Sequence, residues 1–146
     1  MRVVVQRVKE ASCIVDGIEI NSIKKGLLLL IGFTQSDTIA EVQKMAKKIV
    51  NLRIFEDENK KMNLSVVNVN GQILAISQFT LYADTSSGNR PSFVKAAPPD
   101  TANMLYLKFI EILNEIYNVP TFPGMFGADM KLPIVCDGPV TINLEM

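Results

Sequence analysis

Two short segments place polar residues in otherwise apolar, strand-like surroundings, and they are the candidates for a functional site. The first is Ser77-Gln78-Phe79-Thr80-Leu81-Tyr82, which we expect to continue a strand from near Gln72 into a long loop. Where a strand ends, its N–H groups are released from ladder pairing and are left free. Simple alternation, with Gln78, Thr80 and Tyr82 on one face of a strand, explains the same pattern without a function.

The second segment is Asp137-Gly138-Pro139-Val140-Thr141, a tight turn that enters a terminal strand. Asp-Gly and Gly-Pro are common turn dipeptides, so an ordinary turn is the simplest interpretation. Glycine at position 138 also lets the main chain approach another group closely.

Most standard catalytic machinery is absent. The chain has no histidine and two cysteines, Cys13 and Cys136. This excludes Ser-His-Asp and Cys-His relays, His-bearing metal sites and a thiolate zinc site within one chain. No glycine-rich phosphate loop or G-x-S-x-G motif occurs. We expect Cys136, which follows an apolar strand, to be buried. The carboxylates cannot be paired from the sequence and are interpreted as turn or surface acids: Glu56, Asp57, Asp84, Asp129 and Asp137.

Composition predicts one continuous domain over residues 1–146, because 48% of the residues are apolar and no linker, repeat or low-complexity tract occurs. Fifteen basic and fifteen acidic residues give a net charge of zero, so any contact with nucleic acid must be local. The cluster Lys44, Lys47 and Lys48 is either such a contact or a solvated helix face. The longest apolar run is too short to cross a bilayer and no signal segment opens the chain, so we expect a reducing cytoplasm.

Strand patterns dominate the chain. Two-residue hairpin turns are predicted at Asp16-Gly17 and Asn70-Gly71. The run Gly26–Phe33 lacks alternation and predicts a strand buried on both faces. Further strands are predicted over residues 2–8, 13–15, 18–20, 66–69, 72–82, 132–135 and 140–144.

Two amphipathic helices are expected between the strand groups. The first follows an N-cap at Ser36-Asp37 and ends near Asn51. The second is capped by Asp100, runs towards Asn118 and is stopped by Pro120. Its predicted buried stripe is Leu105, Phe109, Ile112, Leu113 and Ile116.

The segment Ala83–Pro99 has neither period and is predicted to be a long loop, a feature that is often functional in compact domains. The expected fold class is α/β, a single domain in which a mixed, curved, barrel-like sheet is covered by two main helices.

Six short motifs are spread over the whole chain: MRVVVQRV at 1–8, GLLLLIG at 26–32, SQFTLY at 77–82, RPSF at 90–93, FGADM at 126–130 and DGPVT at 137–141. Each is weak alone, but the ordered set resembles the D-aminoacyl-tRNA deacylase family. The departures are small: Cys136 stands where asparagine is usual, and Pro133 lies in the preceding strand.

The resemblance implies a homodimeric hydrolase that needs no metal and no organic cofactor. Its substrate would be D-aminoacyl-tRNA, or glycyl-tRNA mischarged on tRNA-Ala, bound through the 3′-terminal adenosine, and its role would be proofreading in translation. The family motifs assign catalysis to Gln78, Phe79 and Thr80. They assign substrate binding to Ser77, Phe126, Gly127 and Met130. They assign rejection of L-substrates to Gly138 and Pro139, which would reach into the active site of the other subunit with Arg7 supporting their loop.

A hydrolase without histidine needs another way to lower the barrier. We expect free main-chain N–H groups at Gln78, Phe79 and Thr80, since one oxyanion donor is typically worth roughly 3 to 4 kcal/mol. Thr80 as a nucleophile is the alternative, but no base is evident, and the substrate's 2′-hydroxyl is favoured instead. We also expect Gly138-Pro139 to be cis. A module that binds a small ligand or aminoacyl-tRNA without chemistry fits the missing machinery equally well.

Overall fold

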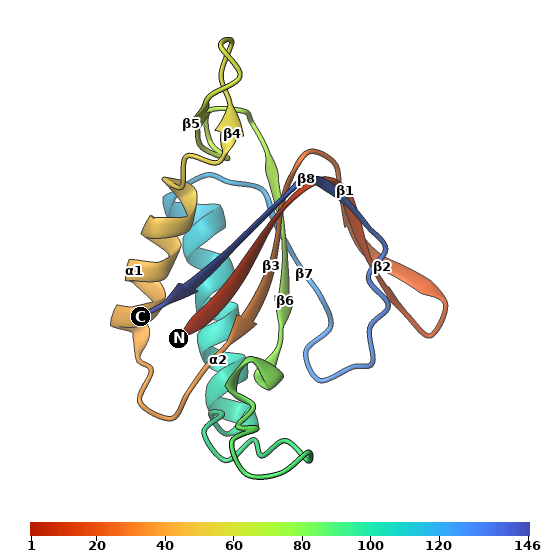
Figure 1. The fold of residues 1–146 in the computed structure, drawn as a ribbon, viewed down its shortest axis with the longest axis vertical. Helices are drawn as coiled ribbons and strands as arrows, with labels where there is room; N and C mark the ends of the chain where they lie inside the picture. The colour runs from red at the N-terminus through yellow and green to blue at the C-terminus, as the bar shows by residue number, and fades with distance from the viewer.

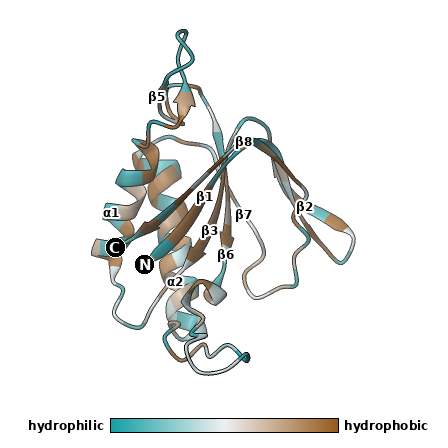
Figure 2. Ribbon diagram, viewed as in Figure 1, coloured by the Kyte–Doolittle hydropathy of each residue, from teal (hydrophilic) through white to brown (hydrophobic).

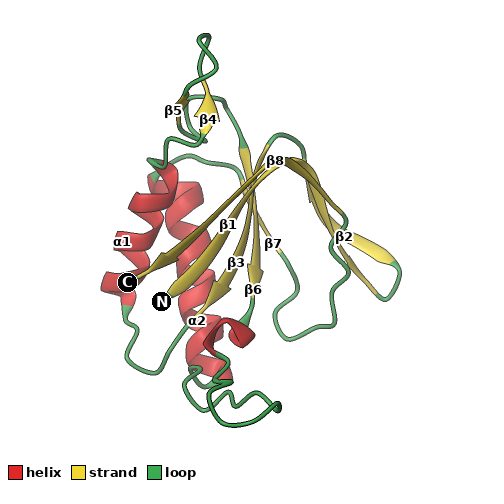
Figure 3. Ribbon diagram, viewed as in Figure 1, coloured by secondary structure: helices red, strands yellow, loops and turns green.

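The computed structural model describes residues 1–146 and contains one mixed sheet with both long helices against the same face (Figures 1 and 3). The strands are β1 (Arg2–Val15), β2 (Ile18–Ile23), β3 (Gly26–Gly32), β4 (Phe55–Glu56), β5 (Met62–Leu64), β6 (Gln72–Ser77), β7 (Thr121–Pro123) and β8 (Ile134–Glu145). The helical segments are α1 (Ile39–Val50), the one-turn η1 (Phe79–Tyr82), α2 (Pro99–Glu111) and the π-turn η2 (Ile112–Ile116). None of the helices is long and apolar enough to span a bilayer.

The sheet is organised around β1. Its first half pairs with β3 and its second half with β2, while β8 pairs along its other edge, all antiparallel. β3, β6 and β7 then continue the sheet as parallel neighbours. The predicted mixed, curved sheet with two helices is confirmed.

β3 has apolar side chains on both faces of the sheet, and both faces are buried. Leu27, Leu29 and Ile31 belong to the main core beneath α1 and α2. Leu28 belongs to a second cluster on the opposite face, formed largely by the far half of β1 and by β6. Both sets are buried, which confirms the prediction for this run. Figure 2 shows the resulting contrast between the apolar central strands and the polar tip of the β4–β5 hairpin.

Both helix caps differ from the prediction. The N-cap of α1 is Thr38, whose hydroxyl accepts from the N–H of Ala40 while the Glu41 carboxylate accepts from the N–H of Thr38. α2 begins at Pro99, and Asp100 lies inside its first turn. The predicted stripe of α2 is buried except for Ile116, which is 62% exposed. The π-turn η2 widens the helix there and rotates this last residue away from the core.

The prediction that Asn70-Gly71 joins two strands of a hairpin was wrong. Residues 66–69 form turns instead of a strand, held by hydrogen bonds between Ser65 and Asn68. β6 therefore has no hairpin partner and pairs in parallel with β3. The predicted strand over 72–82 also ends early, because the chain turns into η1 after Ser77.

The C-terminal third contains a strand that the sequence pattern did not predict and a longer one than it predicted. β7 is only three residues long and includes Pro123, so it carries no measurable alternation. β8 joins the two predicted terminal strands and runs through the Gly138-Pro139 turn. Cys136 on β8 is exposed instead of buried, because β8 pairs only with β1 and its outer face is uncovered.

Candidate active site

A cavity of about 670 Å³ opens where β6 ends, a volume typical of small-molecule sites. Its lining is mostly apolar and joins segments that lie far apart in the sequence. Ser77, Gln78 and Phe79 form one side, and residues 126–130 form the other. Six of the seven residues predicted to act on substrate or to bind it therefore share this cavity. The exception is Thr80, and the six are Ser77, Gln78, Phe79, Phe126, Gly127 and Met130.

The end of β6 leaves two main-chain donors unused. The N–H of Gln78 still bonds the carbonyl O of Ile31 at 2.7 Å, so the prediction that this group is free was wrong. Phe79 and Thr80 occupy the first two positions of η1, where a helix has no acceptor of its own for their N–H groups. No other hydrogen bond engages them. The turn closes one residue later, where the N–H of Leu81 bonds the carbonyl O of Gln78 at 3.3 Å.

The side chains of Gln78, Phe79 and Thr80 make contacts of their own at this turn. The Gln78 amide donates to the Thr80 hydroxyl through a 2.6 Å contact between Nε2 and Oγ1. Thr80 is exposed and does not line the cavity. The ring of Phe79 is 54% exposed and packs edge-on against Phe93, with 5.0 Å between the centroids. An amide cannot take a proton from a hydroxyl, so nothing here activates Thr80 as a nucleophile.

The opposite wall is fixed by main-chain pairing with β1 and β6. Ile14 and Lys131 exchange two main-chain hydrogen bonds of 2.9 Å, and the N–H of Gly124 bonds the carbonyl O of Ala75 at 2.8 Å. Beneath it, Tyr106 donates its hydroxyl to the same Ala75 oxygen at 2.7 Å, and its burial raises the pKa of this phenol above the usual range. Its ring lies 6.0 Å from that of Phe126.

The predicted long loop supplies a third wall that no side-chain pattern identified. Phe93, Ala96, Ala97 and Pro98 line the cavity. Asp84 anchors the loop, because it exchanges two main-chain hydrogen bonds with Ser92 and its carboxylate accepts from Lys95 Nζ at 2.9 Å. That contact, with others from Ser86, holds the pKa of Asp84 well below its usual range.

Gly138 and Pro139 lie outside the cavity of their own chain. The bond between them is cis, as predicted, and both residues are exposed. A Cβ at Gly138, where φ is +126°, would lie 2.8 Å from the Val140 side chain, so glycine is required there.

Arg7 lies beneath this turn and is only 4% exposed. Its guanidinium donates to the carbonyl O of Ile54 at 2.6 Å and to that of Asp137 at 3.1 Å. It also pairs with the Asp137 carboxylate at 3.2 Å. The arginine therefore ties the residue preceding Gly138 to the body of the domain.

No carboxylate dyad exists at the cavity. Asp129 is the acid that lines it, and its exposed carboxylate pairs with Lys131 at 2.9 Å. No group of three histidine, cysteine, aspartate or glutamate side chains lies close enough to hold a metal ion. The groups available for chemistry are thus main-chain amides and neutral side chains.

Comparison with known proteins assigns the chain to a family. Residues 4–145 match the family described as D-Tyr-tRNA(Tyr) deacylase. A protein of Fusobacterium nucleatum named D-aminoacyl-tRNA deacylase is 55% identical over 99% of this chain and 95% of its own length.

Two solved structures share the fold. One, titled c-Myc DNA Unwinding Element Binding Protein, is 43% identical with a TM-score of 0.95 over 100% of this chain and 99% of that one. The other, titled as a probable eukaryotic D-amino acid tRNA deacylase, is 17% identical with a TM-score of 0.82 over 98% of both chains, a likeness of fold alone.

Proposed function

Because this chain belongs to the D-Tyr-tRNA(Tyr) deacylase family, we propose that it hydrolyses the ester bond between a D-amino acid and the 3′-terminal adenosine of tRNA. The products are the free D-amino acid and tRNA. The activity follows from the family. The observation that supports its location is the cavity that joins Phe79, at the start of η1, to the wall formed by residues 126–130.

The N–H groups of Phe79 and Thr80 are proposed to bind the oxyanion. Attack of water on the ester carbonyl places a negative charge on its oxygen, and donors already held in place stabilise that charge without reorganising. Phe79 lies on the cavity wall and both donors start the same turn, which supports their acting together. Gln78, whose own N–H is bonded, contributes through its side chain, which holds Thr80.

Water attack is proposed to be assisted by the vicinal 2′-hydroxyl of the terminal ribose. The chain offers no histidine, and the only side-chain partner of the Thr80 hydroxyl is an amide. A substrate hydroxyl held next to the ester can orient the water at no further cost in translational freedom. Thr80 then positions the turn and forms no acyl-enzyme.

Phe126, Gly127 and Met130 are proposed to bind the terminal adenosine, with Ser77 at the opposite rim. The aromatic ring and thioether offer an apolar surface for a base, and the exposed, positive-φ Gly127 leaves room for the ribose. The remaining apolar part of the cavity, which Phe79 and Phe93 line, then receives the amino-acid part.

Rejection of L-substrates is proposed to come from the main-chain carbonyls of Gly138 and Pro139 of a second subunit. Contacts to a variable side chain cannot separate mirror-image substrates across many amino acids, so rejection must be steric and must use immobile atoms. The exposure of this turn and the buried Arg7 clamp beneath it support that role. Glycyl-tRNA, which carries no side chain to reject, would enter the same pocket.

The homodimer that this requires is supported by the exposed edge formed by β8. This strand pairs only with β1, and it exposes Ile134 at 38% and Val135 at 45%. Long apolar edge strands are normally covered by another chain or protected from one. A cytoplasmic homodimer acting on aminoacyl-tRNA is the state in which we expect this chain to work.

One assay separates this function from a non-catalytic binding module. A trace of protein is mixed with an excess of D-tyrosyl-tRNA, L-tyrosyl-tRNA or glycyl-tRNA at the same enzyme concentration, and release of the amino acid is followed. The enzyme is expected to hydrolyse many equivalents of the D- and glycyl-substrates and to spare the L-substrate. Protection of one equivalent without turnover would instead identify a binding module.

A further inference from the structure

The turn η1, which carries the two main-chain donors proposed for the oxyanion, has little support of its own. It is four residues long. The N–H of Leu81 bonds the carbonyl O of Gln78 at 3.3 Å, and the N–H of Ala83 bonds that of Thr80 at 3.0 Å. A helical segment of this length is not stable by itself in water. Contacts with the rest of the domain must therefore set its position.

The end of β3 supplies one of these contacts. A Cβ added at Gly32 would lie 3.0 Å from the carbonyl O of Gln78, 3.0 Å from the Cβ of Leu81 and 3.3 Å from Cδ2 of Tyr82. The turn is thus packed directly against the main chain of β3, with no room for a side chain between them. Tyr82, the last residue of η1, is buried by this packing.

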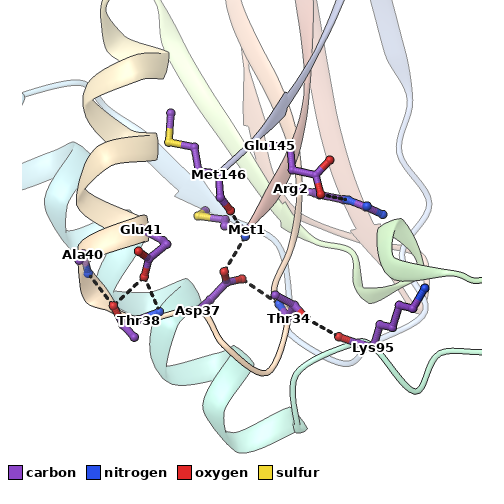
Figure 4. Close-up of polar contacts among 10 residues, drawn as sticks. All are labelled: Met1, Arg2, Thr34, Asp37, Thr38, Ala40, Glu41, Lys95, Glu145 and Met146. Atoms are coloured by element: carbon purple, nitrogen blue, oxygen red, sulfur yellow. Dashed lines mark hydrogen bonds and ion pairs between the residues drawn. The ribbon is translucent and has the colours of Figure 1, made fainter.

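Arg2 holds the turn from another side. Its Nη1 donates to the carbonyl O of Leu81 at 3.0 Å. Its guanidinium carbon lies 4.7 Å from the centre of the Tyr82 ring, which is a cation–π contact. Its Nε also donates to the Glu145 carboxylate at 2.9 Å (Figure 4). One side chain therefore contacts the last two residues of η1 and the end of β8.

The register of the sheet explains why Arg2 can reach the turn. On β1 it pairs with Gly32 of β3 on one side and with Glu145 of β8 on the other. Val3 belongs to the main core beneath the helices, so alternation along the strand places Arg2 on the opposite face of the sheet. The turn η1 follows β6, and β6 lies beside β3.

We infer that Arg2 is a positioning residue for the main-chain donors of Phe79 and Thr80, and that it acts through Leu81 and Tyr82. The donors start η1 and the two residues held by Arg2 end it. In a turn of four residues the last two cannot shift without moving the first two. The pair with Glu145 contributes little to this role, because both of its side chains are largely exposed to water.

The shape of the guanidinium matters as well as its charge. Its planar fork can donate to the Leu81 carbonyl while its face lies over the Tyr82 ring, and a lysine ammonium cannot make both contacts in the same way. Arg2→Lys therefore keeps the positive charge but only part of the support.

Loss of this support is expected to lower kcat and to leave KM nearly unchanged. An oxyanion exists in the transition state and not in the bound ester, so displaced donors weaken transition-state binding alone. This kinetic consequence rests on the proposed function. The increased motion of η1 does not depend on it.

The test compares Arg2→Met, Arg2→Lys and Glu145→Gln with the wild-type chain. KM and kcat are measured for D-tyrosyl-tRNA, and NMR relaxation gives the amide order parameters of Phe79 and Thr80, which report motion on the ps–ns timescale.

Lys24→Met is the matched control. It also replaces a cation by methionine and removes an exposed ion pair, that between Lys24 and Glu10 at 3.4 Å, but it lies away from η1. It should leave kcat, KM and the order parameters at their wild-type values.

Arg2→Met is expected to lower kcat about tenfold, the effect of losing one hydrogen bond from a charged group, while KM changes less than about threefold. The order parameters of Phe79 and Thr80 should fall. Arg2→Lys should give intermediate values of both, and Glu145→Gln should resemble the wild-type chain.

Unchanged order parameters in Arg2→Met would overturn the inference, and so would a raised KM with kcat unchanged. Wild-type behaviour of Arg2→Lys would show that charge alone suffices, and an equal loss of kcat in Glu145→Gln would show that Arg2 acts through β8; either result also contradicts the inference. Should Arg2→Met not fold, Arg2→Lys decides the matter. If the wild-type chain fails to hydrolyse D-tyrosyl-tRNA, the proposed function fails, and the order parameters still test the role of Arg2.

Discussion

Replacing Phe79 by proline tests whether a main-chain N–H performs the catalytic step. Proline removes this one donor and fits the first position of a helical turn, where the N–H has no helical partner. The preceding residue, Gln78, has φ −143° and ψ 84°, which lies outside the α region that a following proline disfavours. The hydrogen bond that closes the turn runs from the N–H of Leu81 to the carbonyl O of Gln78 and does not involve the N–H of Phe79.

The matched control is Phe79→Ala, which removes the ring but keeps the N–H. Loss of the edge-on contact with Phe93 is worth about 0.5 to 1.5 kcal/mol. It is expected to raise KM, because the half-exposed ring lies on the cavity wall proposed to bind substrate. Loss of one oxyanion donor is worth about 2.7 to 4 kcal/mol, or about 100- to 1,000-fold in kcat. The proline variant should therefore have a kcat about 100- to 1,000-fold below that of the alanine variant.

The assay is single-turnover deacylation of D-tyrosyl-tRNA with both variants at saturating enzyme. Their thermal unfolding midpoints are compared to show that the turn is intact in each. Equal rates for the proline and alanine variants at matched stability would refute the assignment of the Phe79 N–H to the oxyanion.

The remaining predictions concern the other parts of the site. Thr80→Ala should keep kcat within about tenfold of wild type, whereas tRNA ending in 2′-deoxyadenosine should be hydrolysed far more slowly; an acyl-Thr80 adduct seen by mass spectrometry would contradict this. Arg7→Met should destabilise the fold by about 1 to 3 kcal/mol in denaturant titrations, since it leaves the buried carbonyl O of Ile54 without its donor. Sedimentation should show a dimer at micromolar concentration, and an active monomer would exclude a shared site. Burial raises the pKa of Tyr82 to about 12, so stability should be retained up to about pH 10 and fall as the pH rises towards 12; Tyr82→Phe should flatten that fall.

The sequence predicted the elements whose pattern is local and missed those decided by partners. Gly26–Phe33 was predicted as a two-faced strand because every residue in it is apolar. Asn70-Gly71 signalled a reversal correctly, and Asn70 has φ +50°, but a turn signal does not name the strand that follows as a neighbour. β6 pairs with β3 because both strands are apolar on two faces and are buried only inside the sheet.

The same distinction explains Asp37. As a short polar residue before an amphipathic run it resembles an N-cap, and Thr38 with Glu41 completes a better one. Asp37 instead accepts a hydrogen bond from the main-chain nitrogen of Met1, 36 residues away, which also donates to the carbonyl O of Met146. No window of sequence contains that contact.

The strand predicted to run through Tyr82 ends early, and the turn that replaces it bears on the proposed site. Free N–H groups were expected because a ladder ends at Gln78, yet Gln78 keeps its bond to Ile31 and the chain then turns into η1. A helical start presents its first N–H groups in one direction, whereas a strand alternates them between its two edges. Two adjacent donors can therefore converge on one oxyanion from a turn and not from an extended strand, so the departure from the predicted strand supports the role proposed for Phe79 and Thr80.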